Sequence, residues 1–136
     1  MVDDQSLAVL DSAALKVLED EAGEAVSRRF VEDYLLMLPA RAARILKGLA
    51  GEDPEPGGQA LMSLRVTSAM AGALRLEGLC GDLERALESG QSPGPIAVKP
   101  VLFANIRLVI HAAAGQGYFP ACPQPAGTTK RAGPAD

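Results

Sequence analysis

Apolar residues spaced three and four positions apart constrain this chain more than any other feature. Between residues 24 and 49 they recur once per turn, at Val31, Leu35, Leu38, Ala42, Ile45 and Leu49. This spacing places the apolar side chains on one face of an α-helix. The core must come from Leu, Val, Ile and Ala, because the chain has only three Phe, two Tyr and no Trp. Leu and Ala have high helix propensity, so we expect an all-α fold.

Glycine and proline divide the chain into predicted helices. Asp11 is a good N-cap for a short helix that Gly23 ends. A long helix follows to Leu49, and Pro39 should kink or divide it. Residues 51–58 (GEDPEPGG) are expected to form a loop, followed by a helical region from residue 59 to 89 with a hinge near Gly72. After the loop at 89–95, a last helix is predicted to begin close to Pro100.

Four long helices with short connections favour an antiparallel four-helix bundle over residues 8–114, capped by the short first helix. Residues 115–136 are rich in Pro, Gly and small side chains. We expect this tail to be flexible or loosely laid on the surface, with Tyr118 and Phe119 as its only anchors.

Charge and cysteine content exclude several classes of partner. The 13 Lys and Arg against 17 Asp and Glu leave a net charge of −4, which disfavours nucleic acid. No apolar run of about 18 residues is apparent, so no membrane contact is expected. The acidic start MVDDQS is unlike a secretory signal. Cys80 and Cys122 lie far apart and resemble neither a disulfide framework nor a zinc site, which indicates a cytoplasmic protein with reduced thiols.

Groups for catalysis are scarce. His111 is the only histidine, so no His pair can hold a metal or complete a triad. We expect it to be a packed or partly exposed structural residue, with buried apolar neighbours on both sides. No glycine-rich phosphate loop occurs, and Cys80 falls on an apolar helix face. The sequence therefore predicts no enzyme, metal or cofactor.

The helix that starts at residue 59 carries two apolar stripes. Its inward face is predicted to hold Leu61, Leu64, Ser68 and Ala71, and a second stripe holds Met62, Val66, Ala69 and Ala73, with Arg65 between them. Two interpretations follow. The helix is buried on two sides, or the second stripe is a docking surface, since contiguous exposed apolar patches mark partner sites.

This region resembles the histidine-containing phosphotransfer (HPt) domain of bacterial phosphorelays. The family segment reads A-H-x-L-K-G-S-A-x-x-x-G-A-x-x-L-x-x-L-C-x-x-L-E, and this chain from Leu61 reads L-M-S-L-R-V-T-S-A-M-A-G-A-L-R-L-E-G-L-C-G-D-L-E. The shared positions are Leu64, Gly72, Ala73, Leu76, Leu79, Cys80, Leu83 and Glu84. The resemblance extends over roughly residues 8–114 and implies a role in two-component signalling in bacteria.

The departures from the family pattern fall at its reactive centre. Met62 occupies the position of the phosphoacceptor histidine, and Arg65 occupies that of the assisting lysine. Val66 occupies the position of a glycine that leaves room for the receiver domain. A thioether has no nucleophilic nitrogen, so Met62 cannot carry a phosphoryl group. The resemblance thus implies a pseudo-HPt module that binds a response-regulator receiver domain or a histidine kinase without phosphotransfer. Its contacts would be Met62, Ser63, Arg65, Val66 and Ala69. The sequence does not determine the oligomeric state, and a monomer is the expected case.

Two alternatives remain open at this point. One is an active phosphotransfer protein that uses His111, with Arg107 one turn before it. The other is a structural bundle that self-associates through the Met62 stripe.

Overall fold

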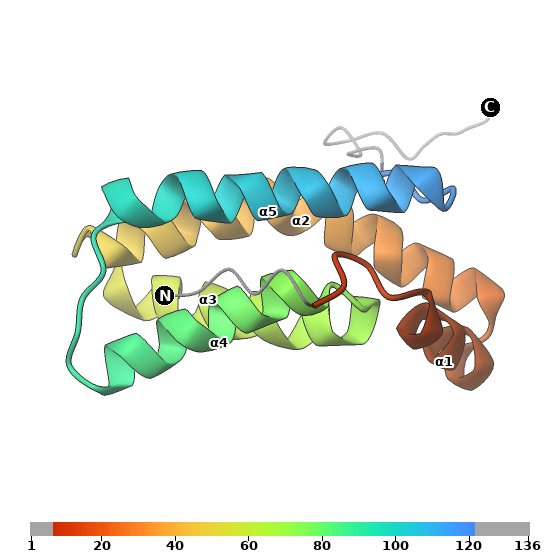
Figure 1. The fold of residues 1–136 in the computed structure, drawn as a ribbon, viewed down its shortest axis with the longest axis horizontal. Coiled ribbons are helices and arrows are strands. Elements are labelled where there is room, and N and C mark those ends of the chain that lie inside the picture. Colours follow the sequence, from red (N-terminus) through yellow and green to blue (C-terminus); the bar gives the residue numbers. More distant parts are fainter. Residues whose placement is uncertain (1–6, 122–136) are drawn as a thin grey trace, which may run out of the picture.

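A computed structural model describes residues 7–121, and this part of the chain is all-α, as predicted. Five helices make it up: α1 (Ser12–Ala22), α2 (Glu24–Leu49), α3 (Pro54–Ala71), α4 (Leu74–Glu88) and α5 (Pro95–Gly115) (Figure 1). No β-strand occurs within these residues.

Two helices begin earlier than the sequence predicts. The start and end of α1 and α2 are confirmed, as is the break at Gly72. However, α3 begins at Pro54 instead of residue 59, and α5 begins at Pro95 instead of Pro100. A proline in the first turn lacks only an N–H that has no partner there, and its fixed φ suits a helix. The prolines expected to form loops therefore start helices.

Of the two effects expected of Pro39, a kink or a division of the helix, the division does not occur. The helix is continuous over 26 residues, with Pro39 on its exposed side. The opposite side buries Leu35, Leu38 and Ala42. Because this buried face continues on both sides of Pro39, packing compensates for the one backbone hydrogen bond that proline removes.

The four long helices enclose one hydrophobic core. Helix α2 packs against α1, α3 and α5, and α4 packs against α3 and α5. Helices α3 and α5 are not in contact with each other, so their outer faces point away from opposite sides of the core. The fully buried side chains come from all four: Leu38, Leu64, Leu76, Leu83 and Leu102.

Helix α5 is long and apolar enough, by length and composition, to cross a membrane, with a mean hydropathy of 1.5. No apolar run of this length is expected from the sequence, and α5 differs from that expectation. In the structure, 33% of the apolar window is buried. Leu102, Ile106 and Val109 belong to the core, and a core helix can have the same composition.

The first residues after α5 lie against α2. The Arg28 guanidinium lies 4.6 Å from the ring centre of Tyr118 and donates a 3.0 Å hydrogen bond to the Gly117 carbonyl. The Ala121 N–H donates to the Glu32 carbonyl at 3.1 Å. Tyr118 is thus an anchor, as predicted, but Phe119 is 59% exposed and is not. The rest of the tail predicted to be flexible lies outside the described residues.

Gly72 joins α3 to α4 in a conformation that requires glycine. Its φ is +84°, and its carbonyl accepts a 2.7 Å hydrogen bond from the Asp11 N–H. A Cβ at this position would lie 2.6 Å from the Asp11 carbonyl oxygen. Both the left-handed backbone and the close approach of residue 11 therefore exclude a larger residue.

We predict that Gly72→Ala lowers the free energy of unfolding by at least about 2 kcal/mol, because strain in the left-handed region adds to the clash with Asp11. Urea unfolding measures this. Gly90→Ala is the matched control: its φ is +87° but nothing lies within 4 Å of the added Cβ, so only the backbone strain remains. Equal losses in the two variants would contradict the proposed clash.

Candidate functional site

The rotation of α3 is fixed by its contacts with α2. The hydroxyl oxygens of Tyr34 and Ser68 share a buried hydrogen bond of 2.7 Å. Near the start of α3 the two backbones almost touch, since a Cβ on Gly57 would lie 2.7 Å from the Gly48 Cα. The predicted inward face of α3 is confirmed, because Leu61, Leu64, Ser68 and Ala71 are all buried.

The opposite side of α3 presents an apolar stripe to solvent. Met62 is 51% exposed, Val66 44% and Met70 45%, and we call these three residues the α3 stripe. The interpretation that α3 is buried on two sides is therefore wrong. Ala69 is half-buried beside the stripe. Ala73 does not belong to it: Gly72 turns the chain away and Ala73 is fully buried.

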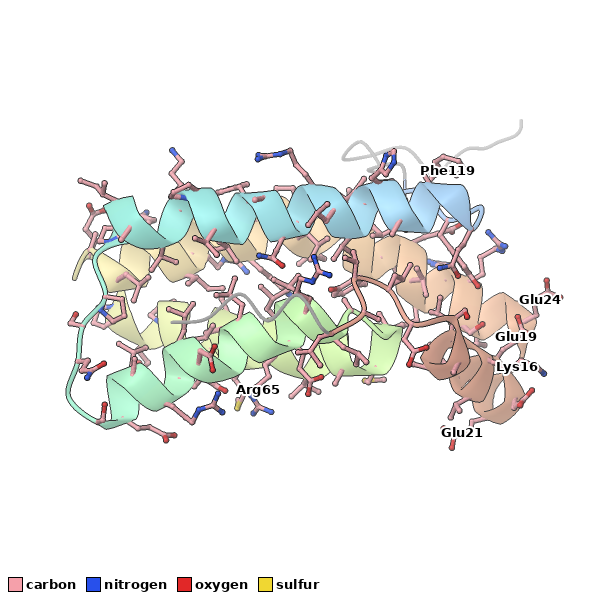
Figure 2. All side chains as sticks on the ribbon, viewed as in Figure 1. Lys16, Glu19, Glu21, Glu24, Arg65 and Phe119 are labelled. Atoms are coloured by element: carbon pink, nitrogen blue, oxygen red, sulfur yellow. The ribbon has the colours of Figure 1, made fainter. Side chains whose placement is uncertain are left out.

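On the α4 side, the cation next to the stripe is already paired. Arg65, labelled in Figure 2, is half-buried. Its Nε forms an ion pair and hydrogen bond with Glu84 of α4. On the same helix, Arg85 pairs with Asp82. The charges along this edge are thus neutralised within the molecule.

On the α2 side, the two arginines nearest the stripe, Arg41 and Arg44, are not paired with carboxylates of the described residues. Arg41 Nη1 donates a 3.2 Å hydrogen bond to Thr67 Oγ1, which itself donates to the Ser63 carbonyl at 2.7 Å. Arg44 forms no hydrogen bond or ion pair with any described residue. The predicted contact Ser63 is half-buried at this edge. Sequence reasoning missed Met70 and both arginines, although Met70 lies eight residues after Met62 and shares its side of the helix.

No nucleophile accompanies the stripe. Cys80 is fully buried, and burial, followed by the nearby Glu84 charge, raises the pKa of its thiol to about 12. Burial likewise raises the pKa of the Tyr34 hydroxyl. Both groups are protonated at neutral pH and shielded from solvent. Within residues 7–121 no group of three or more His, Cys, Asp or Glu side chains is placed to hold a metal ion.

His111 is exposed, and the apolar residues around it, which were expected to be buried, are so only in part: Val109 and Ala113 are buried and Ile110 is half-buried. It lies on the outer side of α5 with Arg107 one turn before it, also exposed. Leu108, on the same turn, is 42% exposed. The apolar composition around His111 misled the sequence interpretation, because α5 has more apolar residues than its buried face can hold.

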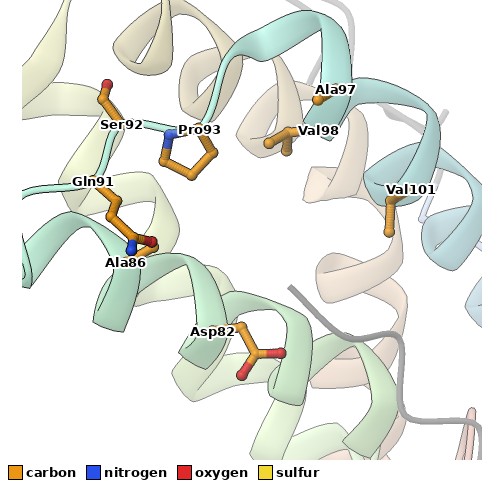
Figure 3. A pocket seen from close by; sticks show the side chains of 8 residues that line it. All are labelled: Asp82, Ala86, Gln91, Ser92, Pro93, Ala97, Val98 and Val101. Carbon is orange, nitrogen blue, oxygen red and sulfur yellow. The ribbon is translucent and has the colours of Figure 1, made fainter.

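A hollow lies between the end of α4 and the start of α5 (Figure 3). It encloses about 540 Å³, and Ala86, Val98 and Val101 contribute apolar walls. Asp82 lies at its α4 side, where Arg85 pairs with it. The hollow offers shape and apolar surface but no reactive group.

Acidic residues gather at the other end of the molecule. Glu19, Glu21 and Glu24 lie around α1 and the start of α2 (Figure 2). There Asp20 accepts a 2.9 Å hydrogen bond from Lys16 and raises the pKa of that amine. The three Glu carboxylates lie away from the α3 stripe, around the first turns of α2 and the helix before it.

Neither the family models nor the curated proteins nor the solved structures with which this chain was compared include a match to it.

The Tyr34–Ser68 bond yields a quantitative prediction. Tyr34→Phe and Ser68→Ala each leave one buried hydroxyl without a partner, which should lower the free energy of unfolding by about 1–3 kcal/mol. The double variant should lose less than the sum of the two, since neither hydroxyl then remains. A double-mutant cycle by urea unfolding measures the coupling. Strictly additive losses would show that the bond does not hold α3 on α2.

Proposed function

We propose that this chain is a pseudo-HPt module: an antiparallel four-helix bundle that binds a receiver domain or a histidine kinase and transfers no phosphate. The all-α fold supports the bundle, because α2, α3, α4 and α5 pack in a closed ring around one core. The same arrangement leaves the α3 stripe on the outside of the ring, where a partner can reach the stripe.

The exposure of Met62 is the observation that carries the proposal. The HPt resemblance aligns Met62 with the phosphoacceptor histidine, and this residue is 51% exposed, on the side of α3 that faces away from the core. Val66, aligned with the clearance glycine, is exposed on the next turn. The position is therefore accessible to a partner but holds an apolar side chain.

The surroundings of Met62 favour binding over chemistry. Phosphoryl transfer needs a nucleophile, and none of the three stripe residues is one. Arg65, aligned with the assisting lysine, is engaged by Glu84. Methionine side chains adapt to the shape of a partner, and Met62, Val66 and Met70 form a continuous apolar strip. A module of this kind would modulate a pathway by competing for, or sequestering, the receiver.

We predict that Met62→Asp and Val66→Asp each weaken binding to a cognate receiver domain by at least about tenfold, because a carboxylate would be buried without a partner. Calorimetric titration of the receiver measures this. Leu108→Asp is the matched control, since Leu108 is similarly exposed at 42% but lies on α5, which has no contact with α3. Unchanged affinity in both stripe variants would refute the docking role.

The same variants test self-association through the stripe. The free chain is expected to sediment as a monomer at all concentrations. The Met62→Asp variant should show the same monomeric state. A mass that rises with concentration in the unmodified chain, but not in Met62→Asp, would favour the structural alternative instead.

A phosphotransfer assay tests the absence of chemistry. The chain should take no phosphate from a receiver charged with acetyl phosphate, whereas Met62→His combined with Val66→Gly should gain this ability, because it restores a nucleophile and clearance. A folded, receiver-binding double variant that accepts nothing would contradict the alignment of Met62 with the acceptor.

The assay also separates the second candidate function. The exposure of His111 and Arg107 on α5 favours phosphotransfer through His111 more than the sequence did. Phosphorylation of the unmodified chain that His111→Ala abolishes would establish that alternative.

A further inference from the structure

A hollow of about 270 Å³ lies between α2 and α3, next to the α3 stripe. Its polar lining consists of Arg41, Arg44, Gln59 and Ser63, with Met37 among its apolar residues. None of the residues that line it is acidic. Ser63 borders both this hollow and the stripe, because it follows Met62 on α3.

Most hydrogen-bond donors of the polar side chains in this hollow have no acceptor within the described residues. Of the five N–H donors on the Arg41 guanidinium, one is used, in the 3.2 Å bond to Thr67 Oγ1. The side chains of Arg44, Gln59 and Ser63 form no hydrogen bond or ion pair within residues 7–121. The nearby carboxylate of Asp53 is engaged by Lys47, at 3.7 Å.

Two guanidinium groups one turn apart on a helix repel each other unless an anion lies between them. Arg41 and Arg44 have this spacing, and the Thr67 bond holds Arg41 against α3. Planar guanidinium groups bind carboxylate and phosphate oxygens in pairs, and amide and hydroxyl donors complete such sites.

We propose that the Arg41–Arg44 hollow is an oxyanion site, which takes a carboxylate or a phosphate group. The group can come from a free anion or from an acidic side chain of the protein that docks on the α3 stripe. The second source rests on the proposed function, and the first does not.

Titration of the full chain with inorganic phosphate and with acetate, at constant ionic strength in chloride, tests the site. Nitrogen NMR of the arginine Nε–H groups should show saturable shifts at Arg41 and Arg44. Arg41→Gln combined with Arg44→Gln should weaken phosphate binding by at least about tenfold, since two charged hydrogen-bond donors are lost. Arg41→Lys with Arg44→Lys keeps the charge but loses the paired N–H donors of the guanidinium groups. We therefore expect an intermediate loss of phosphate affinity.

The matched control is Lys99→Gln with Arg107→Gln, which removes the same charge from the exposed side of α5. It should leave phosphate binding unchanged. Equal losses in the control and the test pair, or no saturable shift with either anion, would overturn the site and leave only general attraction to charge.

A receiver titration then distinguishes the source of the anion. Weaker receiver binding in the Arg41 and Arg44 glutamine variant, with the stripe intact, assigns the site to a partner's acidic group. Unchanged receiver binding, with phosphate binding lost, assigns it to a free anion. If no receiver binds the unmodified chain at all, the proposed function fails, while the phosphate result still decides the oxyanion site.

Discussion

The packing of α3 against α2 determines which side chains the molecule presents to a partner. Successive residues of a helix are turned by about 100°, so a shift of one residue would bring Ala69 towards α2 in place of Ser68. The Tyr34–Ser68 hydrogen bond opposes that shift, because it would leave two buried hydroxyls without partners. The close approach of Gly57 to the Gly48 Cα keeps the start of α3 against α2. The exposure of Met62 and Val66 follows from these contacts.

The two edges of the α3 stripe differ in a way that bears on recognition. Towards α4, Arg65 is neutralised by Glu84, and that edge adds little long-range field. Towards α2, Arg44 is without a carboxylate partner in the described part of the chain. Burial of the stripe supplies affinity, whereas free charge at one edge fixes orientation and speeds encounter. A partner with an apolar centre and acidic groups on one flank would therefore dock in a single orientation.

The sequence predicts the inner faces of the helices well, because a buried face must repeat every three or four residues; Leu61, Leu64 and Ser68 follow this rule. It predicts helix starts poorly, because proline is common both in loops and in the first turn of a helix. Pro54 and Pro95 are predicted to lie in loops, and each begins a helix. The sequence also could not place His111, since apolar neighbours do not reveal which side of α5 faces the core. The Arg41–Arg44 hollow joins two helices, and no pattern within one helix could have revealed it.

On the proposed function, the loss of chemistry and the gain of a binding surface have one physical cause. An imidazole at position 62 would keep water bound in the free state, and a partner that covers it must remove that water at a cost of about 1–3 kcal/mol unless it replaces the hydrogen bond. The thioether of Met62 carries no such cost, and its exposed surface gains free energy when covered. Because differences in affinity between related complexes arise mainly in dissociation, the methionine form should hold its partner longer than a phosphotransfer form would. A long-lived complex is what a competitor requires, whereas a relay protein must release its partner after each transfer.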